Sequence, residues 1–204
     1  DSELQGNIID LCPVGALTSK PYAFSARPWE LKKTETIDVM DGTGSNIRVD
    51  AKGNRVMRIL PRENHSINEE WISDKSRFVW DGIRVQRLDT PFKKTDGKFK
   101  AISWEDALSL ASEKMKSGKT TFVAGDLVSV EALYAASELC EYLEGSKMLG
   151  DFSASCPLSD RSYYVGNGKI EDIDNVDNIV LLGANPRKEA SVINARIRKA
   201  WLSG

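Results

Sequence analysis

One stretch decides the fold of the first half of the chain, namely Asn46-Ile47-Arg48-Val49-Asp50-Ala51-Lys52-Gly53-Asn54-Arg55-Val56-Met57-Arg58-Ile59-Leu60. Apolar and polar residues alternate at its start, strand-forming residues resume at its end, and Lys52-Gly53-Asn54 between them is a turn sequence. Such a pattern predicts a β-hairpin. We therefore expect a small β-rich module over residues 29–90. Its aromatic anchors would be Trp71, Phe78 and Trp80.

The apolar pattern changes to a helical period after about residue 100. Ser103 stands before Trp104-Glu105-Asp106 and approximates a capping box. The predicted elements are, in chain order, a helix from 104, a buried strand at 120–124, a helix ending near 144, a short strand at 148–149, a strand at 176–183 and a basic helix over 188–202. Strands that alternate with helices favour a parallel α/β layer. Two or three strands cannot complete such a layer, so we expect this domain, residues 91–204, to be truncated.

Composition and charge are those of an ordinary globular protein. The 204 residues are 41% hydrophobic and 28% charged, enough for one full domain or two small ones. A net charge of −2 argues against nucleic-acid binding, and the longest apolar run, 179–184, is too short to span a bilayer. Three unevenly spaced cysteines fit a reducing compartment better than a disulfide framework. No targeting segment is recognisable at the start, so we expect a processed, trimmed or incompletely represented chain.

Cys12 is the residue with the most chemical content. It lies in the run Leu11-Cys12-Pro13-Val14-Gly15-Ala16-Leu17, and a cysteine followed by proline is a common form of the last ligand of a ferredoxin-type iron–sulfur site. The proline turns the chain away, and Gly15 and Ala16 let the backbone approach inorganic sulfur. A [4Fe–4S] cluster needs four ligands, however, and no other cysteine lies nearby. From the residues alone, Cys12 can be interpreted either as a cluster ligand or as an ordinary buried thiol.

Several stretches together carry a family likeness. They closely resemble, in the same order and over nearly the whole chain, the large iron–sulfur subunits of NADH:ubiquinone oxidoreductase, respiratory complex I. The stretches are 6–18, 27–30, 58–61, 68–75, 103–108, 185–187 and 194–199. Each motif alone would be a weak signal, and their common order makes the likeness specific.

The resemblance implies a fold and a role for Cys12. That family is similar to the molybdopterin oxidoreductases, which implies a mixed α+β and α/β chain in three parts. Residues 1–28 would be the tail of a ferredoxin-like [4Fe–4S] domain, 29–90 the β-rich module, and 91–204 the start of a molybdopterin-oxidoreductase-like α/β domain. Cys12 would be the fourth ligand of a [4Fe–4S] cluster whose other ligands lie upstream, outside this chain.

The function that the resemblance implies is electron transfer within complex I. NADH and flavin chemistry would occur on another subunit, and this chain would have no independent active site and no molybdopterin. Partners would be the other peripheral-arm subunits, including the flavin/NADH-binding one, on the matrix side of the mitochondrial inner membrane, without membrane insertion. Two alternatives stay open: a molybdopterin-dependent enzyme of the formate dehydrogenase type, and a cofactor-free structural module in which Cys12 is merely buried.

A second cluster motif of this superfamily corresponds here to oxygen side chains. Its form, Cys-x2-Cys-x3-Cys-x27-Cys, falls on Asp38, Asp41, Ser45 and Ser73 with the same spacings. Iron–sulfur clusters bind through thiolates, so we expect no second cluster at these places. A hard-cation site on Asp38 and Asp41 is the alternative. We favour a retained β-scaffold without a cluster.

The remaining candidates receive structural interpretations. The run 183–187 follows a predicted strand, where α/β folds bind nucleotide phosphates, but it lacks a Gly-x-Gly-x-x-Gly pattern and we interpret it as a turn. We expect Cys140 in a helical core, Cys156 in a serine-rich loop and His65 in a polar turn. The basic residues of the last helix are predicted to be solvated, with contact to a neighbouring subunit as the alternative. They are Arg187, Lys188, Arg196, Arg198 and Lys199.

Overall fold

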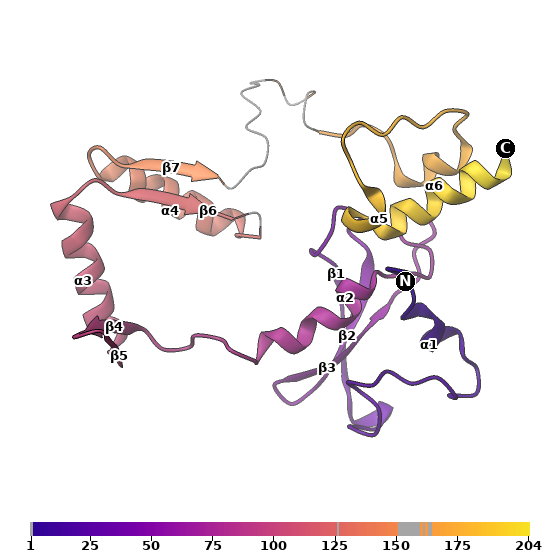
Figure 1. Ribbon diagram of the computed structural model, residues 1–204, viewed down its shortest axis with the longest axis horizontal. Coiled ribbons are helices and arrows are strands. Elements are labelled where there is room, and N and C mark those ends of the chain that lie inside the picture. The colour runs from indigo at the N-terminus through magenta and orange to yellow at the C-terminus, as the bar shows by residue number, and fades with distance from the viewer. Residues whose placement is uncertain (1, 126, 151–159, 161, 163–164) are drawn as a thin grey trace. The chain divides into compact units, whose positions relative to one another are not determined.

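The computed structural model describes residues 2–125, 127–150, 160, 162 and 165–204 (Figure 1). The chain divides into two compact units, one formed by Asp1–Gln86 with Gly166–Gly204 and the other by Arg87–Val165. In the described part of the chain, no helix is both long enough and apolar enough to cross a membrane.

The first unit is built on a three-stranded antiparallel sheet in the order β1-β2-β3. Its strands are β1 (Lys32–Ile37), β2 (Asn46–Lys52) and β3 (Arg55–Pro61). The hairpin predicted at 46–60 is confirmed, with Lys52 opposite Arg55. Gly53 occupies its turn at a φ of +61°, a left-handed conformation that glycine adopts without steric cost.

The core of this unit lies on one face of the sheet. Ile47 and Ile59 pack there with Ile72 and Trp80, so the predicted aromatic anchor at Trp80 is confirmed. Beneath Arg48 and Arg58, the carboxylate of Asp50 is fully buried and accepts from their guanidinium Nε atoms at 2.9 and 2.8 Å. A buried carboxylate needs such partners because its desolvation is otherwise too costly.

Short helices surround this sheet. They are α1 (Asn7–Leu11), η1 (Pro28–Glu30), α2 (Asp74–Phe78), η2 (Val79–Ile83), η4 (Ile170–Asn175), α5 (Pro186–Glu189) and α6 (Ser191–Ser203). At the start of α2, Ser73 Oγ accepts a hydrogen bond from Ser76 N at 3.1 Å, which satisfies one of the free amides of the first turn.

The basic helix α6 is not fully solvated. The side chain of Arg196 is 3% exposed, and its Nη1 lies 2.7 Å from Asp174 Oδ2. The guanidinium also donates to the carbonyl oxygens of His65 and Ile67. Lys199 pairs with Glu69 at 3.0 Å. The prediction of a solvated face is therefore wrong at Arg196, because the loop before α2 supplies backbone acceptors that charge patterning along the helix cannot reveal.

The strand predicted at 176–183 is wrong. None of the described strands pairs with this run, and it has no regular secondary structure. Its apolar side chains are exposed, Leu182 to 87% and Val180 to 77%. Hydrophobicity and β-branching predict a strand only where a hydrogen-bonding neighbour is available, and none of the described strands takes that place.

The second unit contains the α/β elements. They are β4 (Phe92–Thr95), β5 (Lys98–Ala101), α3 (Trp104–Ser117), β6 (Thr121–Ala124), α4 (Val130–Tyr142) and β7 (Lys147–Gly150). Strands β6 and β7 pair in parallel, as predicted. Ser103 Oγ accepts from Asp106 N at 3.0 Å and caps α3, also as predicted. The β4–β5 hairpin was not predicted, although Asp96-Gly97, both at positive φ, is a recognisable hairpin turn.

Candidate functional site

Cys12 directly follows α1, at the point where the chain leaves the helix. Its backbone is extended, with φ −75° and ψ 107°, and its side chain is partly exposed. The chain then turns through Pro13 to Gly15, which has a φ of +66°. A side chain at residue 15 would meet no neighbour within 4 Å, so the backbone conformation, rather than lack of space, requires glycine there.

This turn brings backbone amides to the sulfur of Cys12. The backbone N–H groups of Leu17, first, and of Val14, with those of Ala16 and Gly15, act on the Cys12 sulfur. Together they lower the pKa of the Cys12 thiol below its usual range, because N–H donors stabilise the thiolate. Iron–sulfur clusters are bound by thiolates whose sulfur accepts such hydrogen bonds. The residues around Cys12 therefore fit a cluster ligand.

The surface beside Cys12 is apolar. Exposed large hydrophobic side chains precede and follow it, namely Ile8, Leu11, Val14 and Leu17. Within the described residues, no group of three or more His, Cys, Asp or Glu side chains could hold a metal ion. Cys12 alone thus supplies one thiolate, and any cluster it holds takes its other ligands from elsewhere.

The oxygen-substituted cluster motif is a buried polar site. Asp38, Ser45 and Ser73 are 5%, 1% and 3% exposed. Asp38 N donates to Ser45 O at 2.8 Å, and Ser76 Oγ donates to Asp38 Oδ2. Ser73 Oγ lies 2.7 Å from Ser76 Oγ. Because the Ser76 hydroxyl donates its hydrogen bond to Asp38, the Ser73 hydroxyl is the donor in its contact with Ser76.

Ser76 is the residue of this site that sequence reasoning missed. The available signal was its place three residues after Ser73, the spacing at which a capping serine and a residue of the first helical turn face one another. Asp41, by contrast, is only partly buried, and its Oδ1 accepts from Thr43 N at 2.9 Å in a local turn. Hydrogen bonds therefore bring three of the four motif places together, whereas Asp41 bonds within its own turn.

Three of the four carboxylate oxygens of this motif accept hydrogen bonds. Asp38 Oδ1 accepts from Met40 N at 3.0 Å while its Oδ2 accepts from Ser76. With these bonds in place, Asp38 and Asp41 satisfy their charge through N–H and O–H donors. The arrangement favours a hydrogen-bonded scaffold over a hard-cation site.

The turn at 183–187 begins a helix of only four residues, α5. Glu189 Oε2 accepts from Asn185 N at 3.1 Å, so the chain's own carboxylate accepts a hydrogen bond from the amide at the start of this helix. Of the other candidates, Cys140 is partly buried on α4, and exposed His65 pairs with Glu63 at 2.8 Å. Cys156 lies outside the described residues.

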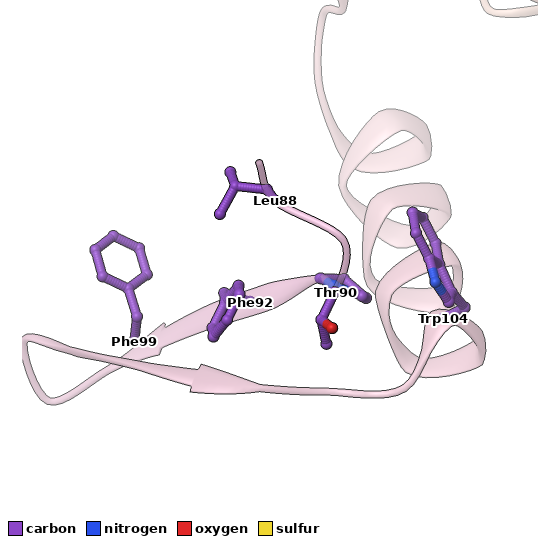
Figure 2. Close-up of a pocket in the computed structure, with 6 residues that line it drawn as sticks. Leu88, Thr90, Phe92, Phe99 and Trp104 are labelled. Carbon is purple, nitrogen blue, oxygen red and sulfur yellow. The ribbon is translucent and has the colours of Figure 1, made fainter. Parts of the chain in front are cut away.

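The second unit carries an apolar pocket of about 610 Å³ between the β4–β5 hairpin and α3. Figure 2 shows Phe92 and Phe99 on the hairpin, Leu88 before it and Trp104 on the helix. Thr90 is its only polar lining residue of the described chain. A pocket that selects a small ligand normally has several converging polar groups, so this one does not point to a substrate.

Two family models match the chain. The first, described as NADH-ubiquinone oxidoreductase NDSU1/NuoG-like, 4Fe-4S domain, matches residues 31–81. The second, described as Molybdopterin oxidoreductase, matches residues 87–204. The segment 31–81 contains the motif places Asp38, Asp41, Ser45 and Ser73 and has no cysteine in its sequence.

Curated relatives are similar over almost the whole chain. The NADH-ubiquinone oxidoreductase 78 kDa subunit of Neurospora crassa is 53% identical over 99% of this chain and 28% of its own length. The NADH dehydrogenase [ubiquinone] iron-sulfur protein 1 of Solanum tuberosum is 49% identical over 97% of this chain and 28% of its own length. The NADH-ubiquinone oxidoreductase 75 kDa subunit of Reclinomonas americana is 45% identical over 100% of this chain and 32% of its own length. The chain thus spans less than a third of the length of these relatives.

Proposed function

Because the chain belongs to the molybdopterin oxidoreductase family, in its branch of large iron–sulfur subunits of NADH:ubiquinone oxidoreductase, we propose that it serves electron transfer in respiratory complex I. In this role it is a subunit without an active site of its own. Electrons from NADH and flavin on another subunit pass through [4Fe–4S] clusters towards ubiquinone, and most of the 204 residues act as scaffold.

Within that function, Cys12 is the fourth ligand of a [4Fe–4S] cluster whose other ligands lie outside this chain. The observation that supports this role is the lowered pKa of the Cys12 thiol, caused first by the backbone N–H of Leu17 and then by that of Val14 in the turn at Gly15. When bound, the cluster supplies one-electron redox chemistry. The chain's own residues hold the thiolate, since Gly15 forms the turn that aims these amides and the flanking apolar side chains limit access of water.

The β-rich module keeps its scaffold without a cluster. The polar site around Asp38 supports this assignment, because Ser73 and Ser76 fill it with hydrogen bonds rather than thiolates. The family model described as a 4Fe-4S domain matches residues 31–81, a segment that has no cysteine in its sequence. The boundaries of the three parts, 1–28, 29–90 and 91–204, belong to the same proposal.

The partners and the location follow from the same assignment. The chain contacts other peripheral-arm subunits, including the flavin/NADH-binding one, on the matrix side of the mitochondrial inner membrane. Relatives named as mitochondrial subunits support this location.

The test replaces Cys12 with Ala in the intact complex. We expect loss of one [4Fe–4S] EPR signal together with NADH:quinone activity, because an iron that loses its thiolate no longer holds the cluster firmly. Cys140→Ala is the matched control, a free cysteine on α4 in the other unit, and it should leave every cluster signal in place. Retention of all cluster signals in Cys12→Ala would contradict the ligand assignment.

A molybdopterin-dependent oxidoreductase is the second candidate, and the family match over 87–204 is the observation that favours it. Against it stands the turn at 185–189, where the carboxylate of Glu189 bonds to Asn185 N and would repel a pterin phosphate. Elemental analysis of the purified complex decides between the two, since the second function requires stoichiometric molybdenum.

A further inference from the structure

Arg77 of α2 joins the β-rich module to the helix that precedes Cys12. Its guanidinium Nη2 donates to Asn7 Oδ1 at 2.8 Å and lies 2.8 Å from Asp10 Oδ2. The Arg77 side chain is 4% exposed, and that of Asp10 is 29% exposed. One buried cation therefore contacts α1 at its first residue, Asn7, and again at Asp10, one residue before its end.

The start of α1 is packed tightly against the same helix. A Cβ atom at Gly6 would lie 2.7 Å from both Arg77 Cδ and Asp74 Oδ1, so a larger residue would force these side chains to move. Gly6 N donates to Asp74 Oδ1 at 2.7 Å, and Asn7 Nδ2 donates to Ile72 O at 2.8 Å. These bonds attach the start of α1 to α2 and to the segment before it.

This attachment fixes the position of the cysteine. Asp10 precedes Cys12 by two residues, and α1 ends at Leu11 without a flexible spacer. The contact of Asp10 with Arg77 is therefore made two residues before the residue that carries the sulfur. In the sequence, nothing near Cys12 signals a partner more than sixty residues further along the chain.

We propose that Arg77 and Asp10 are positioning residues for the iron–sulfur cluster held by Cys12, and that their charges offset one another at that cluster. This inference rests on the proposed ligand role of Cys12. Reduction adds one negative charge to a [4Fe–4S] cluster, so an uncompensated cation nearby favours the reduced form and an uncompensated anion disfavours it. In the intact pair, the effects of the Arg77 and Asp10 charges on the reduction of the cluster largely cancel.

The pair predicts shifts of opposite sign when either partner is neutralised in the intact complex. Asp10→Asn leaves the Arg77 cation alone and should raise the midpoint potential of the cluster that Cys12 binds. Arg77→Gln leaves the Asp10 anion alone and should lower it. The double variant should lie closer to the wild-type value than either single variant, because both charges are then absent. Potentiometric EPR titration measures all three.

Controls separate positioning from general stability. Lys199→Gln removes an exposed cation from the ion pairs of α6 with Glu69 and Asp174, in the same unit, and should leave the potential unchanged. Arg77→Lys retains the positive charge but not the planar guanidinium that contacts both Asn7 and Asp10. It should therefore keep a near-wild-type midpoint potential with a broadened EPR signal. If the complex with Arg77→Gln does not assemble, Asp10→Asn alone tests the proposal. Asp10 is the more exposed partner of the pair, so its replacement disturbs the fold less.

Unchanged potentials in both single variants, or shifts in the same direction, would overturn the proposal. That outcome is distinct from failure of the ligand assignment, which Cys12→Ala tests through the presence or absence of the cluster signal itself.

Discussion

Ser76 donates its hydroxyl hydrogen bond to the buried carboxylate of Asp38, across the site that corresponds to a cysteine cluster motif. Asp38 is 5% exposed and Ser76 is 1% exposed, so water cannot replace either partner. The contact joins the segment after β1 to the helix α2.

Removing this hydroxyl should weaken the fold measurably. Ser76→Ala leaves a carboxylate oxygen buried with one donor fewer, and an unsatisfied buried polar group costs about 1–3 kcal/mol. Urea unfolding followed by fluorescence of the five tryptophans gives the free energy of unfolding. Ser25→Ala, at an exposed serine, should change it by no more than about 0.5 kcal/mol. Equal losses of unfolding free energy in Ser76→Ala and Ser25→Ala would show that the contact between Ser76 and Asp38 contributes nothing specific to stability.

Asn7 is expected to protect a specific backbone amide from exchange. Its Oδ1 accepts from Ile72 N at 3.2 Å in a fully buried position. Asn7→Ala should accelerate hydrogen exchange at Ile72 N and cost about 1–3 kcal/mol, because both Ile72 backbone groups lose a side-chain partner. Native-state exchange by NMR measures the effect. Asn54→Ala, in the exposed hairpin turn, is the control, and unchanged protection at Ile72 in Asn7→Ala would refute the assignment.

The conformation of Gly15 predicts a cost that is independent of crowding. Alanine there would meet no neighbour within 4 Å but would have to adopt a φ of +66°. Left-handed backbone costs a non-glycine residue about 1–2 kcal/mol, so Gly15→Ala should destabilise by that amount and perturb the Cys12 thiol. Gly42→Ala is the control. A Cβ atom at residue 42 would also meet no neighbour within 4 Å, but Gly42 is not at positive φ. Differential scanning calorimetry compares the two, and a smaller loss at Gly15 than at Gly42 would contradict the strain argument.

The amides around Cys12 predict a pH-dependent reactivity. Because they lower the pKa of its thiol, alkylation by iodoacetamide should set in below the ordinary thiol pKa of about 8.5. In urea the midpoint should return to the ordinary value. The lowered pKa also stabilises the fold. Its contribution to the free energy of unfolding is complete above the pKa of the unfolded thiol and is lost as the pH falls through the pKa of the folded thiol. Peptide-resolved mass spectrometry measures the midpoint at Cys12, and identical midpoints in folded and unfolded chains would exclude the effect.

Local patterns predicted the elements whose stabilising contacts are local. The hairpin at 46–60 was recognisable because alternation and Gly53 agree, and the cap at Ser103 because its acceptor lies three residues away. The run 176–183 failed for the opposite reason, since a strand depends on an edge elsewhere in the chain. Propensity cannot report whether that edge is available.

The candidate site divides in the same way. Cys12 could be singled out from its neighbours Pro13 and Gly15, and the places at Asp38, Asp41, Ser45 and Ser73 through the family resemblance, whose cluster motif has the same spacing. Arg77 could not, because its contacts with Asn7 and Asp10 bridge some seventy residues of sequence. Long-range side-chain pairs leave no local signature, and only the folded chain reveals them.

Two neighbouring residues of α2 connect distant parts of the first unit. Ser76 of this five-residue helix bonds to Asp38, and Arg77, the next residue, bonds to Asn7 and Asp10. A helix of this length cannot absorb a shift at one of these residues without moving the other. Substitutions around Asp38 should therefore be epistatic with substitutions around Cys12, because both sets of contacts are made by neighbouring residues of α2.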